Sequence, residues 1–100
     1  MSLDKYLTAF DELLKDLENC SPAERLVRYA AARTILEEFV AAAQEHTREF
    51  RGEVMNYTLV LSKLKTMMGC FQQAALPEPG VNVNEKIKSA RMNLEKAGQG

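Results

Sequence analysis

The sequence predicts an all-α protein folded as a helical bundle. Apolar side chains recur every three or four residues through most of the 100-residue chain, which places them along one side of a helix. Only 3 Pro and 5 Gly interrupt this pattern, and the prolines fall at predicted helix boundaries. The expected elements are a short helix at 3–20, a long helix or helix pair at 22–76, and a short helix at 85–97.

The composition limits the class of protein. The chain is 46% hydrophobic and 27% charged, with a formal net charge of −1. A disordered chain has fewer apolar residues and a larger net charge, so we expect a folded domain. The near balance of charge argues against a nucleic-acid binder held by bulk positive charge. The longest apolar run, 39–43, is too short to cross a membrane, which needs roughly 20 residues.

The cellular location is predicted from the first residues and the cysteines. The N-terminus shows neither a basic leader nor a long apolar stretch, which is why no secretory signal is predicted. Cys20 and Cys70 stand fifty residues apart and form no paired motif. We therefore expect reduced thiols and a cytoplasmic protein.

The boundary between the first two helices is the strongest local signal in the chain. The run Ser21-Pro22-Ala23-Glu24 offers a serine N-cap, a proline at the first helical position and a glutamate at the third. The first helix should therefore end near residue 20, and the second should begin at once. So short a connection favours antiparallel neighbours.

Two arrangements are open for residues 22–76. A turn at Arg51-Gly52 would give two helices, whereas an uninterrupted helix would be roughly 80 Å long. The apolar stripe keeps its phase from Phe50 to Val54, which favours the uninterrupted helix. Such a rod would need a second copy to cover it, so we expect a homodimer. The expected core residues are Leu36, Phe39, Phe50, Val54, Tyr57, Leu61 and Leu64.

The domain organisation follows from the prolines near the C-terminus. Residues 1–76 form the predicted bundle, and 77–84 form a Pro/Gly linker. Residues 85–100 hold the short amphipathic helix and a frayed tail, with Asn82 or Asn84 as the helix cap. This helix either docks on the bundle or becomes ordered on a partner.

No catalytic, cofactor-binding or metal-ligating residues are predicted. His46 is the only histidine, and neither cysteine has a base beside it in the sequence. A structural zinc site needs four ligands, and a nucleophile needs an adjacent base. We therefore expect a protein that is not an enzyme and needs no cofactor.

The expected function is protein–protein interaction. Residues 53–76 are apolar on several sides, so another surface must cover them. We predict an adaptor, chaperone or small inhibitor that binds another protein through Met55, Leu59, Met67, Met68 and Phe71. The same side chains could instead form an ordinary core or a dimer interface. No motif links the chain to a known family.

A second hypothesis concerns the basic residues. Arg25 and Arg28 gather at the start of the second helix, and the C-terminal helix is locally basic. The alternative function is a nucleic-acid-associated regulator that contacts a polyanion through Arg25, Arg28, Lys86, Lys88 and Arg91.

Overall fold

The chain forms an all-α bundle, as the sequence predicts. A computed structural model describes residues 3–45 and 57–99. The elements in chain order are α1 (Leu3–Leu14), the short 3-10 helix η1 (Leu17–Asn19), α2 (Pro22–Glu45), α4 (Tyr57–Ala75) and α5 (Val83–Gln99). The described residues contain no strand.

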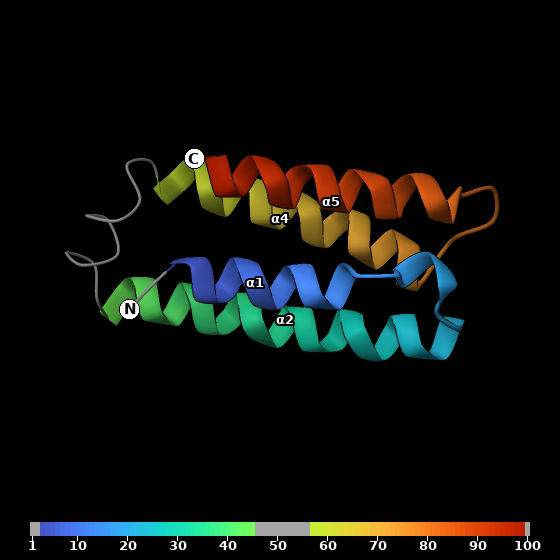
Figure 1. The fold of residues 1–100 in the computed structure, drawn as a ribbon, viewed down its shortest axis with the longest axis horizontal. Helices are drawn as coiled ribbons and strands as arrows, with labels where there is room; N and C mark the ends of the chain where they lie inside the picture. The colour runs from blue at the N-terminus through green and yellow to red at the C-terminus, as the bar shows by residue number, and fades with distance from the viewer. Residues whose placement is uncertain (1–2, 46–56, 100) are drawn as a thin grey trace.

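The four long helices run alternately up and down the bundle (Figure 1). α1 contacts α2 and α5, and α4 likewise contacts α2 and α5, with the α4–α5 pair packed most extensively. Each helix thus has two neighbours and turns its apolar side toward a shared core. This is the arrangement expected when short connections join antiparallel helices.

Aromatic side chains join α2 to both of its neighbours. The ring of Phe39 meets Tyr6 of α1 edge-on at a centroid distance of 5.5 Å, and stacks on Tyr57 of α4 at 5.8 Å. Tyr29 packs against Phe71 of α4 at 5.8 Å. These contacts span both ends of the α2–α4 pair and fix the two helices antiparallel.

The predicted uninterrupted helix over 22–76 is wrong, and the alternative helix pair is confirmed. α2 ends at Glu45, and α4 begins at Tyr57 and lies beside α2 (Figure 1). The bundle is 43 Å along its longest axis, about half the length of the predicted rod. Folding back lets one chain cover its own apolar sides, so this fold needs no second copy for that purpose. The suggested turn at Arg51-Gly52 lies outside the described residues.

The expected core is largely present. Phe39 and Leu64 are fully buried. The three partly buried members packed against the core are Leu36, Tyr57 and Leu61. Phe50 and Val54 lie outside the described residues.

The first helix ends earlier than predicted. α1 stops at Leu14 rather than near residue 20, because Asp16 adopts a left-handed conformation with φ of 53°. This conformation commonly ends a helix. η1 then returns Leu17 to the core, so the apolar stripe stays buried after the regular helix has ended.

The predicted start of α2 is confirmed, and Asn82, one of the two predicted caps, is the cap of α5. The hydroxyl of Ser21 accepts a hydrogen bond from the Glu24 amide at 3.2 Å, and α2 begins at Pro22. The Asn82 side chain accepts one from the Glu85 amide, also at 3.2 Å. Each cap satisfies an amide that has no partner within the helix.

α5 docks on the bundle instead of extending from it as a tail. It spans Val83–Gln99, two residues longer at each end than predicted. Its buried residues are Ile87, Ala90, Leu94 and Ala97. They join the core that α5 shares with α4 and α1, so α5 covers part of the apolar surface of α4.

Candidate functional site

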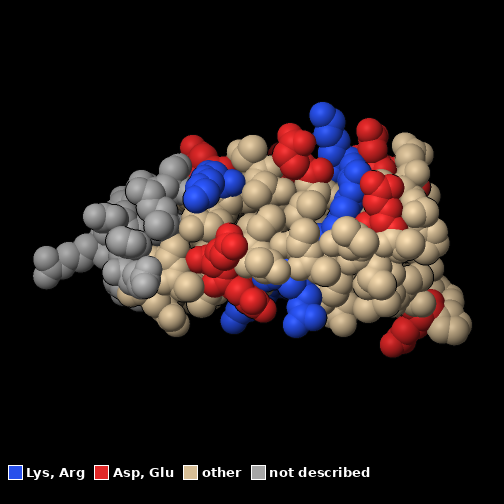
Figure 2. Space-filling view, turned by 90° about the horizontal axis from the view of Figure 1, so that it is seen from below, with Lys and Arg blue, Asp and Glu red and all other residues tan. Residues whose placement is uncertain are grey.

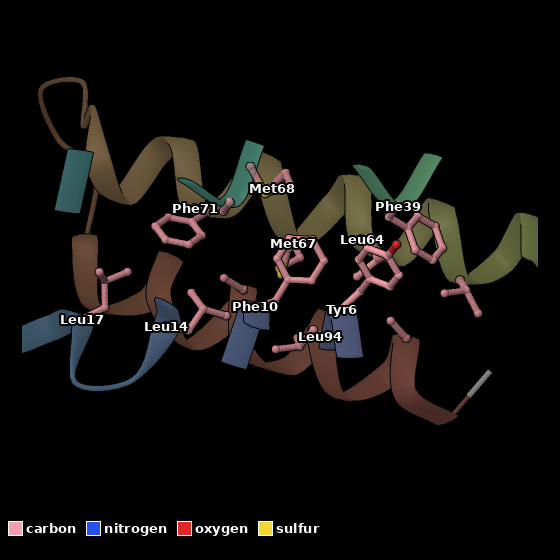
Figure 3. Packing of buried hydrophobic residues seen from close by; sticks show 14 of the residues in the cluster. Tyr6, Phe10, Leu14, Leu17, Phe39, Leu64, Met67, Met68, Phe71 and Leu94 are labelled. Atoms are coloured by element: carbon pink, nitrogen blue, oxygen red, sulfur yellow. The ribbon is translucent and has the colours of Figure 1, made fainter. Parts of the chain in front are cut away.

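The predicted partner-binding residues of α4 lie mostly in the core. Met67 and Phe71 have no exposed surface, and Met68 is 7% exposed. Figure 3 shows Met67 and Phe71 pointing from α4 into the space between the helices. These three residues do not form an open groove, which corrects that expectation in favour of an ordinary core. Leu59 is exposed at 44%, and Met55 lies outside the described residues.

Of the five residues predicted to contact a polyanion, three lie together at one corner of the bundle and bind groups of the same chain. We call Arg25, Arg28 and Arg91 the arginine corner, where α1, η1 and α2 meet. Arg25 donates from Nε to the Leu17 carbonyl at 3.0 Å and from Nη2 to the Glu18 carbonyl at 2.9 Å. These bonds tie the start of α2 to η1.

Arg28 reaches across to the end of α1. Its Nη1 donates to the Lys15 carbonyl at 2.6 Å and to the Leu13 carbonyl at 3.4 Å. Its Nη2 forms an ion pair with Glu24 at 3.3 Å. The last carbonyls of a helix lack partners within it and carry partial negative charge, so a guanidinium stabilises them.

Arg91 of α5 completes the corner through a two-pronged ion pair with Glu18. Its Nη1 and Nη2 lie 2.6 and 2.8 Å from the two carboxylate oxygens, and Nη2 also donates to the Leu14 carbonyl at 2.7 Å. The hydrogen bond from Arg91 is the main cause that lowers the pKa of Glu18 from its ordinary value of 4.5 to about 2. Glu18 is therefore a carboxylate under all ordinary conditions.

The arginine corner holds the chain together and leaves little charge for a ligand. Its guanidinium groups bind carbonyls and carboxylates of the same chain, as the ends of packed helices require. The other two predicted residues, Lys86 and Lys88, lie on α5, where Lys88 is exposed. The structure therefore does not gather the five residues into one open basic patch.

The surface that stands out lies on α2. We define the outer face of α2 as the exposed residues Ala23, Leu26, Val27, Ala30, Ala31, Thr34 and Ala41, which share one side of the helix with the exposed acids Glu37 and Glu38. Val27 is 69% exposed and Leu26 is 42% exposed. Figure 2, which views the bundle from the α2 side, shows an area of uncharged residues that is bordered by acidic and basic groups.

This outer face was not identified from the sequence. α2 carries apolar residues all around its circumference, and its alanine clusters suggested close contact with neighbouring helices. Among the described helices, α1 and α4 are the main neighbours of α2, so the side turned away from both stays open. The available signal was the low number of charges between Leu26 and Ala32.

No chemical centre accompanies this surface in the described parts of the chain. Residues 3–45 and 57–99 contain no group of three His, Cys, Asp or Glu that could hold a metal ion. Cys20 and Cys70 are free thiols, both partly buried. Among the described helices, none is long and apolar enough to cross a membrane. His46, the one histidine of the sequence, lies outside the described residues.

Comparisons with known proteins add no relative. No protein family, curated protein or solved structure matches the chain.

Proposed function

We propose that the chain is a non-enzymatic protein–protein interaction module, acting as an adaptor, chaperone or small inhibitor, and that it binds through the outer face of α2. The observation that carries this proposal is the exposure of Val27 and Leu26, at 69% and 42%, in the stretch of α2 from Leu26 to Ala32, whose one charged residue, Arg28, binds the end of α1. Burying such side chains against a partner removes apolar surface from water and is favourable.

The position of this face also supports the proposal. Phe39 packs α2 against Tyr6 of α1 and Tyr57 of α4, and the Ser21 cap stabilises the start of the helix. A partner would therefore meet a preformed helix and would not have to order it. Preorganised surfaces bind more tightly because less conformational entropy is lost.

The nucleic-acid alternative has less support. Arg25, Arg28 and Arg91 already bind the end of α1, η1 and Glu18, and freeing them would leave those carbonyls without partners. Lys86 and Lys88 alone give a small basic area. We therefore keep protein binding as the proposed function.

The test compares partner capture by matched variants. Leu26→Asp/Val27→Asp should lose a partner that the wild-type chain retains, because a charge cannot be buried unpaired without a large cost. Met92→Asp is the control, since Met92 is 47% exposed and lies on α5 rather than on α2. Bound proteins are identified by mass spectrometry after affinity capture.

Two outcomes would contradict the proposal. The first is equal retention of every partner by the wild-type chain and by Leu26→Asp/Val27→Asp. The second is loss of the same partners from Met92→Asp, which would place binding elsewhere. Circular dichroism of each variant checks that the helices remain.

A further inference from the structure

We propose that the outer face of α2 binds the outer side of α4 on a second copy of this chain. This inference rests on the proposed function, because it names the partner of the same surface. It differs from the dimer predicted from the sequence, since here each bundle stays intact and two different outer faces meet.

The side of α4 turned away from the core is a stripe of exposed, uncharged residues. They recur at alternating steps of three and four residues, which places them along one line of the helix. We define the outer face of α4 as Leu59, Ser62, Thr66, Gly69, Gln73 and Leu76. Leu59 and Leu76 stand at its two ends and are 44% and 52% exposed. This spacing is typical of a helix that packs along another helix.

The two outer faces carry opposite charges. α4 contains two charged residues, Lys63 and Lys65, which lie on opposite flanks of its uncharged stripe. Glu37 and Glu38 share the outer side of α2 and are both exposed. None of these four charges forms an ion pair within the described residues. A contact between the two faces would therefore bring unpaired acids to unpaired lysines.

One register satisfies the charged and the apolar positions together. Leu26 precedes Glu37 by eleven residues, and Lys65 precedes Leu76 by eleven, which is about 16 Å along either helix. When the two helices run antiparallel, Glu37 faces the partner's Lys65 while Leu26 meets the partner's Leu76. The equal spacing means that neither pair has to be given up for the other.

The same register accommodates the remaining charges on this side of α2. Glu38 faces the partner's Lys63, on the flank of the contact opposite to Glu37. Arg33 lies one turn before Glu37 and comes beside the partner's Gly69, which has no side chain to exclude it. Each contact thus pairs two acids with two lysines and sets no acid against an acid.

Small side chains in the middle of both faces allow the helices to approach closely. Thr34 lies opposite the partner's Gly69, and Ala41 opposite the partner's Ser62, all of them exposed. The distance between packed helices depends on the side chains at the contact, so these pairs favour a short one. The contact also covers four of the five large apolar side chains exposed in the described residues, namely Leu26, Val27, Leu59 and Leu76.

The contact is head-to-tail, because it joins two different faces. α2 and α4 are antiparallel within one chain, and they are antiparallel again in the contact between copies (Figure 1). Neighbouring copies therefore point the same way, and a copy that uses one face keeps the other for a further copy. A single pair of helices buries less than the roughly 1,200–2,000 Å² typical of stable complexes, so the association should depend on concentration.

The experiment reverses the charges of one face at a time. Glu37→Lys/Glu38→Lys carries lysines on both outer faces, and Lys63→Glu/Lys65→Glu carries acids on both. Each variant alone should self-associate at least about tenfold more weakly than the wild-type chain, because attraction becomes repulsion. In an equal mixture, the reversed face of each variant meets a face of opposite charge on the other variant, and association should recover.

Sedimentation equilibrium gives the association constants of each sample. One variant is labelled with nitrogen-15, so that native mass spectrometry can show whether the two variants occur in the same assembly. Lys88→Glu/Lys96→Glu is the matched control, since it makes the same change in net charge on exposed positions of α5 and should associate like the wild-type chain. Circular dichroism checks that every variant keeps its helices.

The outcomes separate this inference from the proposed function. A wild-type chain that remains monomeric at every concentration overturns the contact between copies, and so does a mixture that stays as weak as the single variants. If a different protein is then lost from Leu26→Asp/Val27→Asp, the proposed function stands without self-association. Recovery in the mixture, with both variants in one assembly, supports the contact whether or not any other protein is captured.

Discussion

Replacing Phe71 with alanine is expected to lower the free energy of unfolding by about 3–5 kcal/mol. The Phe71 ring has no exposed surface and packs on Tyr29, so its removal leaves a cavity between α4 and α2. A domain of this size has a total stability of about 5–15 kcal/mol, so much of the chain's stability depends on this residue.

Urea unfolding followed by circular dichroism measures the effect. Met92→Ala, at a half-exposed position of α5, is the control and should change the free energy of unfolding by less than about 1 kcal/mol. If Phe71→Ala kept the wild-type stability, Phe71 would not be a core residue. The prediction from the sequence that Phe71 binds a partner would then be supported.

Replacing Arg91 with methionine is expected to cost about 1–2 kcal/mol at pH 7. The change removes the ion pair with Glu18 and the bond to the Leu14 carbonyl, while it keeps an apolar stem of similar length. The estimate is modest because both charged side chains are more than one-third exposed, at 39% and 35%, and water screens their attraction.

The cost of this substitution should depend on pH. Because Arg91 lowers the pKa of Glu18 in the folded chain to about 2, the folded state favours the carboxylate. The resulting stability is complete above about pH 5 and is lost as the pH falls toward the folded-state pKa. The difference between wild type and Arg91→Met should therefore shrink from pH 5 to pH 2.

Thermal unfolding at a series of pH values measures this difference, with Lys88→Met on the same helix as the control. The control should differ little from wild type at any pH, because Lys88 is exposed and forms no ion pair within the described residues. A difference for Arg91→Met that stays constant down to pH 2 would show that the ion pair does not set the pKa of Glu18.

Local signals allowed the start of α2 and the cap of α5 to be predicted. The cap at Ser21 and the cap at Asn82 depend on side chains and amides three residues apart, so the sequence alone contains both partners. The periodic apolar stripe likewise predicted helical structure over 3–20 and 22–76, although it favoured one uninterrupted helix where the structure has α2 and α4. By contrast, the left-handed residue that ends α1 is Asp16, an ordinary residue that carries no strong stop signal.

The missed features depend on contacts between distant parts of the chain. Residues of α4 such as Met67 were interpreted as a binding surface because the sequence did not show that α5 would cover them. The arginine corner was missed because most of its acceptors are backbone carbonyls, which every residue possesses. The outer face of α2 became visible only when both neighbours of α2 were known.

The separation of Arg91 and Glu18 along the chain has a consequence for folding kinetics. Their contact closes a loop of 73 residues, whereas α4 and α5 are joined by a short connection. Closing a long loop costs more entropy, so the α4–α5 hairpin should form before the corner does. An interaction that is absent from the folding transition state mainly affects the unfolding rate. Arg91→Met should therefore unfold faster in stopped-flow experiments while its refolding rate stays close to that of the wild-type chain.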